Sequence, residues 1–230
     1  MRIHVAFTPH ETSHAKTAIV IDVLRATSTI AQALAAGYRR VLCCAEIEEA
    51  RALRAAEPHA VLAGERLCVR IPGFDLGNSP REFTSAQGET LILTTTNGTR
   101  AIASAASRCD RILAGSLVNL EAVAAAARGE AGDVVLVCAG VKGEFALDDA
   151  YCAGRIADLL AGEASDAASA AIRLARSFSE PRAGLAASQS GRNLVDAGLD
   201  EDIDWCARES VLDVVPRLVG MHGSTVEMAL

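Results

Sequence analysis

Short apolar segments alternate with alanine-rich segments along most of this chain of 230 residues. Short apolar runs bounded by turn residues predict strands, and longer runs with apolar residues every three or four positions predict helices. The expected strands cover residues 2–7, 17–22, 40–44, 60–63, 90–94, 111–114 and 133–138. The expected helices cover residues 27–36, 46–56, 98–106, 119–128 and 149–162. Parallel neighbours need crossover connections, so this alternation predicts an α/β fold of layered α/β/α type with a largely parallel or mixed sheet.

The pattern changes after residue 165. Further helices are expected at 165–178, 183–190 and 200–208, and residues 213–228 are expected to form a terminal strand or a hairpin. A turn-rich stretch at 72–90 interrupts the alternation, and loops of that length inside compact domains are often functional. We expect a single domain over residues 1–230, with two α/β lobes divided near 125–145 as the alternative.

The charge and the cysteine content indicate which ligands and which cellular compartment suit this chain. The net charge is −7 and no run of Lys or Arg is long, which argues against nucleic-acid binding but leaves a small anionic ligand open. The seven cysteines are odd in number and contain no C-x-x-C pair, so we expect free cysteines rather than disulfides or a structural zinc site. The first residues lack the apolar core of a signal peptide, and no apolar segment is long enough to span a membrane. The expected location is the cytoplasm.

Two strand-to-helix corners carry unusual polar residues. Thr94-Thr95-Thr96-Asn97-Gly98-Thr99-Arg100 follows an apolar run, and Asp22 and Arg25 follow another. Ligands of open α/β sheets bind where strands end and helices begin, and helix starts attract anions. These corners therefore predict a site for a phosphorylated acid.

Asp22 is the best-placed acidic residue, because it interrupts a run that should be buried and so needs a cation, a metal or a donor as partner. The alternative is a structural pair with Arg25. Thr27 and Ser28 either cap the following helix or bind an anion. Glu65 and Arg66 follow the expected strand at 60–63. They are either a metal ligand and an anion clamp or an exposed ion pair.

Other acidic residues have simpler explanations available. Asp75 lies among turn residues and could organise that turn, while Asp148 and Asp149 could cap a helix. The sequence contains no Gly-x-x-x-x-Gly-Lys phosphate loop, no Gly-x-Gly-x-x-Gly after a strand and no Gly-x-Ser-x-Gly. Nucleotide binding and a histidine-dependent triad are therefore disfavoured.

Taken together, these motifs resemble the 2-phosphosulfolactate phosphatase family, which acts in coenzyme M biosynthesis. The matching segments are VIDVLRAT (20–27), GER (64–66), GFDLGNSP (73–80), TTTNGTRA (94–101), VCAG (137–140), FALDD (145–149) and CAG (152–154). The resemblance covers roughly residues 5–160 in order and continues more weakly through Gly191-Arg192-x-Leu194, Asp202-Ile203, Cys206-Ala207 and Val215-Pro216. It implies a layered α/β fold, a Mg²⁺-dependent phosphatase that converts 2-phosphosulfolactate to sulfolactate and phosphate, and a homo-oligomer.

The resemblance also suggests roles for the candidate residues. Asp22 and Glu65 would hold Mg²⁺, with Asp75 as a third ligand or as the base that activates water. Two groups of residues would contact the anionic parts of the substrate: Arg25, Thr27 and Ser28 in one, and Thr96, Asn97, Gly98, Thr99 and Arg100 in the other. Arg66 would hold the carboxylate or the sulfonate, and Asp149 would join the site if the loop before it folds back. A phosphatase for another small phosphorylated hydroxy acid and a non-catalytic binder of such metabolites are the alternatives.

Overall fold

The computed structural model describes residues 1–11 and 14–230. Its strands are β1 (Arg2–Ala6), β2 (Thr17–Ile21), β3 (Arg40–Cys44), β4 (Val61–Arg66), β5 (Val69–Arg70), β6 (Thr90–Thr94), β7 (Arg111–Gly115), β8 (Val134–Cys138), β9 (Glu163–Ala164), β10 (Arg217–His222) and β11 (Thr225–Ala229). Its helices are α1 (Ala26–Ala35), α2 (Ile47–Ala56), α3 (Gly98–Ala106), α4 (Leu120–Arg128), α5 (Leu147–Leu160), α6 (Asp166–Arg176), α7 (Pro181–Ala186), α8 (Gln189–Asp196) and α9 (Asp200–Cys206), with a short 3₁₀ turn η1 (Pro80–Glu82).

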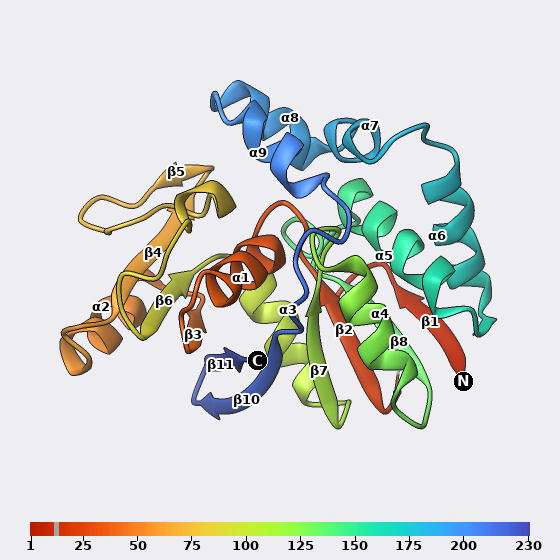
Figure 1. Cartoon of the computed structure of the whole chain (residues 1–230), viewed down its shortest axis with the longest axis horizontal. Coiled ribbons are helices and arrows are strands. Elements are labelled where there is room, and N and C mark those ends of the chain that lie inside the picture. Colours follow the sequence, from red (N-terminus) through yellow and green to blue (C-terminus); the bar gives the residue numbers. More distant parts are fainter. Residues whose placement is uncertain (12–13) are drawn as a thin grey trace.

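The described strands form one mixed sheet in the order β5-β4-β6-β3-β11-β10-β7-β2-β8-β1-β9. It contains two parallel blocks, β4-β6-β3 on one side and β7-β2-β8-β1 with β9 on the other. The hairpin β10–β11 lies between the blocks and pairs antiparallel with β7 and β3. The two blocks are therefore joined by β10 and β11, which lie in the middle of the sheet (Figure 1).

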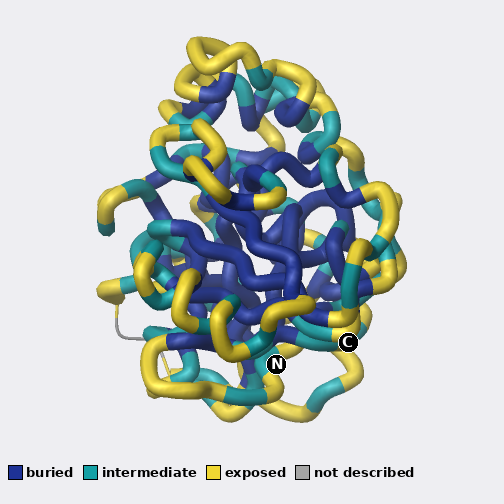
Figure 2. Tube along the Cα trace, turned by 90° about the vertical axis from the view of Figure 1, so that its left-hand side faces the viewer, coloured by how far each residue is buried: buried dark blue, intermediate teal, exposed yellow. Residues whose placement is uncertain are grey.

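Helices cover both faces of the sheet, as the side-chain alternation along the strands requires. In β2, Ala18 and Val20 pack with α1 and α3, whereas Ile19 and Ile21 pack with α4 and α5. Helix α2 covers the opposite face of the β4-β6-β3 block. The strands form the buried interior, and most exposed segments lie around it (Figure 2). The expected layered α/β/α fold with a mixed sheet is confirmed.

The seven strands and the first five helices expected from the sequence all form, with small differences at their ends, and residues 213–228 supply the hairpin. The single helix expected at 183–190 is wrong. Two helices, α7 and α8, meet there, because the Ser188 side chain caps the start of α8 by accepting the Gly191 N–H at 2.8 Å. The short edge strands β5 and β9 were not expected. The single-domain interpretation and the alternative boundary near 125–145 stay predictions.

All seven cysteines are free, as expected. Within residues 1–11 and 14–230, we find no helix with both the length and the apolar surface needed to cross a bilayer.

Candidate active site

The candidate site is a cavity of about 340 Å³ at the carboxyl ends of β2, β4, β6 and β8, partly covered by α8. It is lined by Asp22, Leu24, Arg25, Glu65, Leu67, Cys68, Asn78, Thr95, Thr96, Asn97, Val141, Lys142, Gln189, Ser190, Asn193 and Leu194. The carboxyl edge of a parallel sheet is where α/β proteins bind their ligands. The two corners singled out in the sequence thus belong to a single cavity.

Two helices from different blocks bring these corners together. Helix α1 follows β2 of one block, α3 follows β6 of the other, and both pack on the same face of the sheet. Their first turns touch, because a Cβ atom on Gly98 would lie 2.8 Å from the Cβ of Ala26. The amino-terminal ends of α1 and α3, which both carry a partial positive charge, therefore lie next to each other.

Asp22 lies at this meeting point. Its Oδ1 accepts the Ala26 N–H at 3.2 Å, and the Gly98 N–H also stabilises the ionised carboxylate. Its backbone is held by the Thr27 hydroxyl, which donates to the Asp22 carbonyl at 3.0 Å and accepts the Asp22 N–H at 3.2 Å. The carboxylate is thus fixed in place by the start of each helix.

Buried carboxyl groups cluster behind the cavity. The pKa of Asp22 is raised from 3.8 to about 7, mainly by burial and less by the charges of Asp148 and Glu65, while the N–H groups of Ala26 and Gly98 oppose the rise. Burial also raises the pKa of Asp148 to about 6, and burial and the charges of Asp148 and Asp22 raise the pKa of Asp149 well above its usual value. This concentration of acids favours a bound cation.

Asp149 connects the loops that follow β2 and β8. Its Oδ1 accepts the Val23 N–H and its Oδ2 accepts the Gly140 N–H, both at 2.9 Å. The side chain therefore satisfies two buried donors next to Asp22, although it does not line the cavity itself. Asp149 is a structural clamp behind the site rather than a simple helix cap.

Arg25 is a buried cation in the lining. It is 4% exposed, and its Nη1 lies 2.5 Å from Oδ2 of Asp202 on α9. The other carboxylate oxygen of Asp202 accepts the Ser79 hydroxyl at 2.6 Å. Lys142 adds an exposed cation at the cavity. The backbone N–H of Lys142 donates to Oδ1 of Asn97 at 3.3 Å.

Asp75, predicted as a third metal ligand or a base, is not among the residues that line the cavity. Its Oδ2 accepts the Leu62 N–H at 2.8 Å and pairs with Arg54 at 2.7 Å, so it ties the turn to β4 and α2 outside the cavity. Burial alone would raise its pKa, but the hydrogen bonds from Leu62 and Arg54 outweigh that effect and lower it.

Two of the three arginines predicted to bind anions, Arg66 and Arg100, do not line the cavity. Arg100 is exposed and pairs with Glu46 at 3.1 Å. Arg66 donates to the carbonyl of Ala45 at 2.7 Å and to that of Glu65. The side chains of both arginines are therefore engaged by partners outside the cavity lining.

Hydroxyl groups predicted to contact substrate are mostly used by the protein itself. Thr27 bonds to the Asp22 backbone, and the Ser28 hydroxyl donates to the Val23 carbonyl at 2.8 Å. The buried Thr99 hydroxyl has no hydrogen-bond partner within the described residues. Thr96 and Asn97 do line the cavity, and the first-turn N–H of Gly98 is directed at Asp22.

Several lining residues were missed by the sequence reasoning. They are Asn78, Lys142 and the α8 residues Gln189, Ser190 and Asn193. Asn78 and Lys142 lie in or beside quoted motifs, so their position was a signal that could have been used. Helix α8 carried only a weak signal, the Gly191-Arg192-x-Leu194 segment of the resemblance, and its approach to the cavity depends on long-range packing.

The donors present fit a divalent cation. Within the described part of the chain, no group of three or more His, Cys, Asp or Glu side chains is arranged to hold a metal ion. Mg²⁺, however, is often bound through only one or two carboxylates, together with water and substrate oxygens. Asp22 and Glu65 supply two carboxylates to one cavity. The raised pKa of Asp22 reflects burial first and nearby negative charge second, and a bound cation would offset both.

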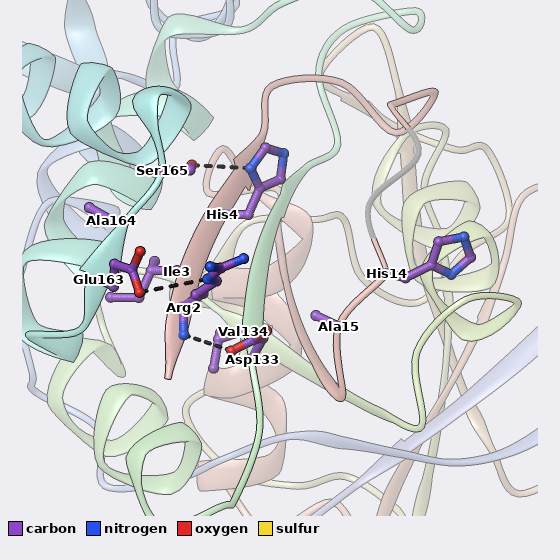
Figure 3. A pocket seen from close by; sticks show the side chains of 10 residues that line it. All are labelled: Arg2, Ile3, His4, His14, Ala15, Asp133, Val134, Glu163, Ala164 and Ser165. Carbon is purple, nitrogen blue, oxygen red and sulfur yellow. Dashed lines mark hydrogen bonds and ion pairs between the residues drawn. The ribbon is translucent and has the colours of Figure 1, made fainter.

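Another hollow, of about 400 Å³, lies at the amino ends of β1 and β8 (Figure 3). Its polar side chains pair with one another: Arg2 with Glu163 at 3.6 Å, and His4 Nδ1 with the Ser165 hydroxyl at 3.1 Å. The side chains of Arg2 and Glu163 are about three-quarters exposed. This hollow lacks the buried, convergent charges of the cavity at the carboxyl edge.

Comparison with known proteins agrees with the motifs. The profile of a family described as 2-phosphosulpholactate phosphatase matches residues 4–220. A protein of Carboxydothermus hydrogenoformans is 43% identical over 94% of this chain and 92% of its own length. Similar proteins of Deinococcus radiodurans (39%, covering 95% and 94%) and Thermus thermophilus (37%, covering 98% and 98%) carry the same name, probable 2-phosphosulfolactate phosphatase.

Proposed function

The chain belongs to the 2-phosphosulfolactate phosphatase family, and we propose that it hydrolyses 2-phosphosulfolactate to sulfolactate and phosphate with the help of Mg²⁺. The observation that carries the proposal is the shared cavity in which Asp22, Glu65 and Arg25 meet the 95–97 loop. The substrate is a three-carbon acid with three anionic groups, and a cavity of about 340 Å³ suits a molecule of that size.

Asp22 and Glu65 would hold the cation. When bound, Mg²⁺ would neutralise charge on the phosphoryl group, which lowers the barrier of an otherwise very slow hydrolysis. The N–H groups at the starts of α1 and α3 fix the Asp22 carboxylate, so it needs no rearrangement to act as a ligand.

Other residues would bind the anionic groups of the substrate. Arg25 presents a buried guanidinium whose charge is little screened by water. Thr96, Asn97 and Lys142 lie along the same cavity and supply hydroxyl, amide and ammonium donors for a second group. Together these donors support an orientation in which the phosphoryl group faces Asp22 and Glu65.

The test is phosphate release from 2-phosphosulfolactate by the purified protein. We expect turnover that EDTA abolishes and Mg²⁺ restores, and at least a 100-fold loss in an Asp22→Asn variant that keeps its fold. Phospholactate and phosphoglycerate serve as comparison substrates. A clear preference for either would assign the chain to another phosphorylated hydroxy acid, and binding without turnover of any of the three would make it a non-catalytic binder.

Two further properties belong to this proposal. Seven free cysteines suit a reducing compartment, so we place the enzyme in the cytoplasm. The family resemblance supports a homo-oligomer, which size-exclusion chromatography with light scattering would test.

A further inference from the structure

Arg25 and Asp202 form a salt bridge that is almost completely buried. The side chain of Arg25 is 4% exposed and that of Asp202 is 0% exposed, and Nη1 and Oδ2 are 2.5 Å apart. The two residues are 177 positions apart in the chain. A buried charge is costly without a partner, so removing either residue would leave the charge of the other buried and unpaired.

The two residues of this pair differ in how many hydrogen-bonding groups they leave free for a ligand. Asp202 uses both oxygens inside the protein, one for Arg25 and one for the Ser79 hydroxyl at 2.6 Å. Arg25 has five N–H donors, and the only hydrogen bond of its side chain within the described residues is the one to Asp202. Because Arg25 also lines the cavity, the remaining donors are available to a ligand.

The carboxylate comes from a part of the chain that the proposed chemistry does not use. Asp202 lies on α9, which packs against η1 and the neighbouring helices α7 and α8. In Figure 1 these three helices lie together above the carboxyl ends of β2 and β7. Helix α8 contributes Gln189, Ser190 and Asn193 to the cavity lining. The group α7–α9 therefore contacts the site through α8 and through Asp202.

We propose that Asp202 is a positioning residue, which holds the Arg25 guanidinium in the cavity so that its free donors bind an anionic group of the substrate. The inference rests on the proposed function for the identity of that substrate, but the binding of an anion to Arg25 does not depend on hydrolysis. One contact from α9 fixes the position of Arg25, and the Ser79 hydroxyl in turn fixes the carboxylate.

The experiment compares Asp202→Asn with Asp204→Asn. The two substitutions are identical in chemistry and lie on the same helix, but Asp204 is exposed and pairs with Arg182 on the surface. Calorimetry gives the dissociation constant of inorganic phosphate in the presence of Mg²⁺, and steady-state kinetics gives KM and kcat. Each substitution is also made together with Arg25→Gln. Thermal unfolding shows whether each variant is folded.

We expect Asp202→Asn to raise the phosphate dissociation constant and the KM about tenfold, with kcat changed less than about threefold. Asp204→Asn should match the parent protein. In the Arg25→Gln background, Asp202→Asn should add less than about twofold, because its effect passes through the arginine. If Asp202→Asn does not fold, Ser79→Ala replaces it and should weaken phosphate binding about threefold, since it frees one oxygen of Asp202.

A folded Asp202→Asn variant that binds phosphate as tightly as Asp204→Asn would overturn the inference, even if its melting temperature is lower. A full tenfold effect that persists in the Arg25→Gln background would also overturn it. If the parent protein releases no phosphate from 2-phosphosulfolactate but the variants keep the expected order of phosphate affinities, the proposed function fails and the positioning role of Asp202 stands.

Discussion

Gly98 lies so close to Asp22 that a Cβ atom at position 98 would be 2.9 Å from Oδ2 of the carboxylate. The same atom would be 2.8 Å from the Cβ of Ala26. Only a residue without a side chain therefore allows the starts of α1 and α3 to meet at the acid. This contact links the β2 corner to the β6 corner and makes the cavity a single site.

We expect Gly98→Ala to lower kcat/KM about 100-fold, because small displacements of catalytic groups have effects of that size. The free energy of unfolding should fall by about 1–3 kcal/mol, the usual cost of overpacking. Phosphate-release kinetics and urea unfolding measure the two effects. Gly129→Ala is the matched control, because its added Cβ would make ordinary contacts at 3.6 Å at the end of α4. Equal activity in the two variants would contradict the expected contact.

The buried acids make stability depend on pH when no cation is present. The pKa of Asp22 is about 7 in the folded protein against 3.8 when exposed, and that of Asp148 is about 6. A raised carboxyl pKa means that the folded state binds protons more tightly than the unfolded state. The stability that this proton binding contributes is complete below pH 4 and is lost as the pH rises to 7. In EDTA, the melting temperature should fall between pH 5 and pH 8.

Mg²⁺ should reverse this loss, because a cation stabilises the ionised carboxylates. The difference in melting temperature between Mg²⁺ and EDTA should therefore grow from pH 5 to pH 8. Asp22→Asn should flatten the pH dependence in EDTA and reduce the effect of Mg²⁺. A melting temperature in EDTA that is higher at pH 8 than at pH 5 would contradict this account.

Asp75→Asn tests whether Asp75, which lies outside the cavity lining, takes part in catalysis. Asp75 is about 45% exposed on its side chain and holds Arg54 and the Leu62 N–H outside the cavity. We expect kcat/KM to change less than about twofold, while the free energy of unfolding falls by about 1 kcal/mol through the lost charged hydrogen bonds. Asp22→Asn, measured in parallel, should lose activity. Loss of turnover in a folded Asp75→Asn variant would return Asp75 to the site.

Asp149→Asn should damage both stability and activity. An asparagine has one carbonyl oxygen and cannot accept from both Val23 and Gly140, so one buried N–H loses its partner. The expected cost is about 1–3 kcal/mol of unfolding free energy, and activity should fall because Val23 adjoins Asp22. Asp158→Asn provides the comparison on the same helix, since Asp158 pairs with Arg176 at the surface. Similar stability losses in both variants would argue against the clamp.

Local patterns in the sequence were enough to predict most of the fold and the position of Asp22. Apolar runs and alanine-rich helices depend on neighbouring residues, so most strands and helices were found where periodicity placed them, with the 183–190 segment as an exception. The two polar corners were predicted as parts of one site, and both line the same cavity, since strand ends of a parallel sheet meet at one edge. The family resemblance, built on the same motifs, is confirmed by the match over residues 4–220.

The remaining features depend on contacts that local sequence does not show. The turn that carries Asp75 directs its carboxylate toward Arg54, and nothing in the motif reveals that direction. Thr27 and Ser28 have hydroxyls that bond to the preceding backbone, a choice that short polar side chains often make near helix starts. Asp202 meets Arg25 only after α9 packs beside the sheet, so no spacing rule could pair them.

The hairpin β10–β11 has a consequence for the order in which the molecule is assembled. During synthesis, strands β3 and β7 leave the ribosome long before Arg217, and until then each has an open side where the hairpin will later insert. Open strand edges attract other strands, so the nascent chain passes through a period of exposure to aggregation. Because β10 and β11 lie between the two parallel blocks, the sheet can be completed only after this hairpin has been synthesised.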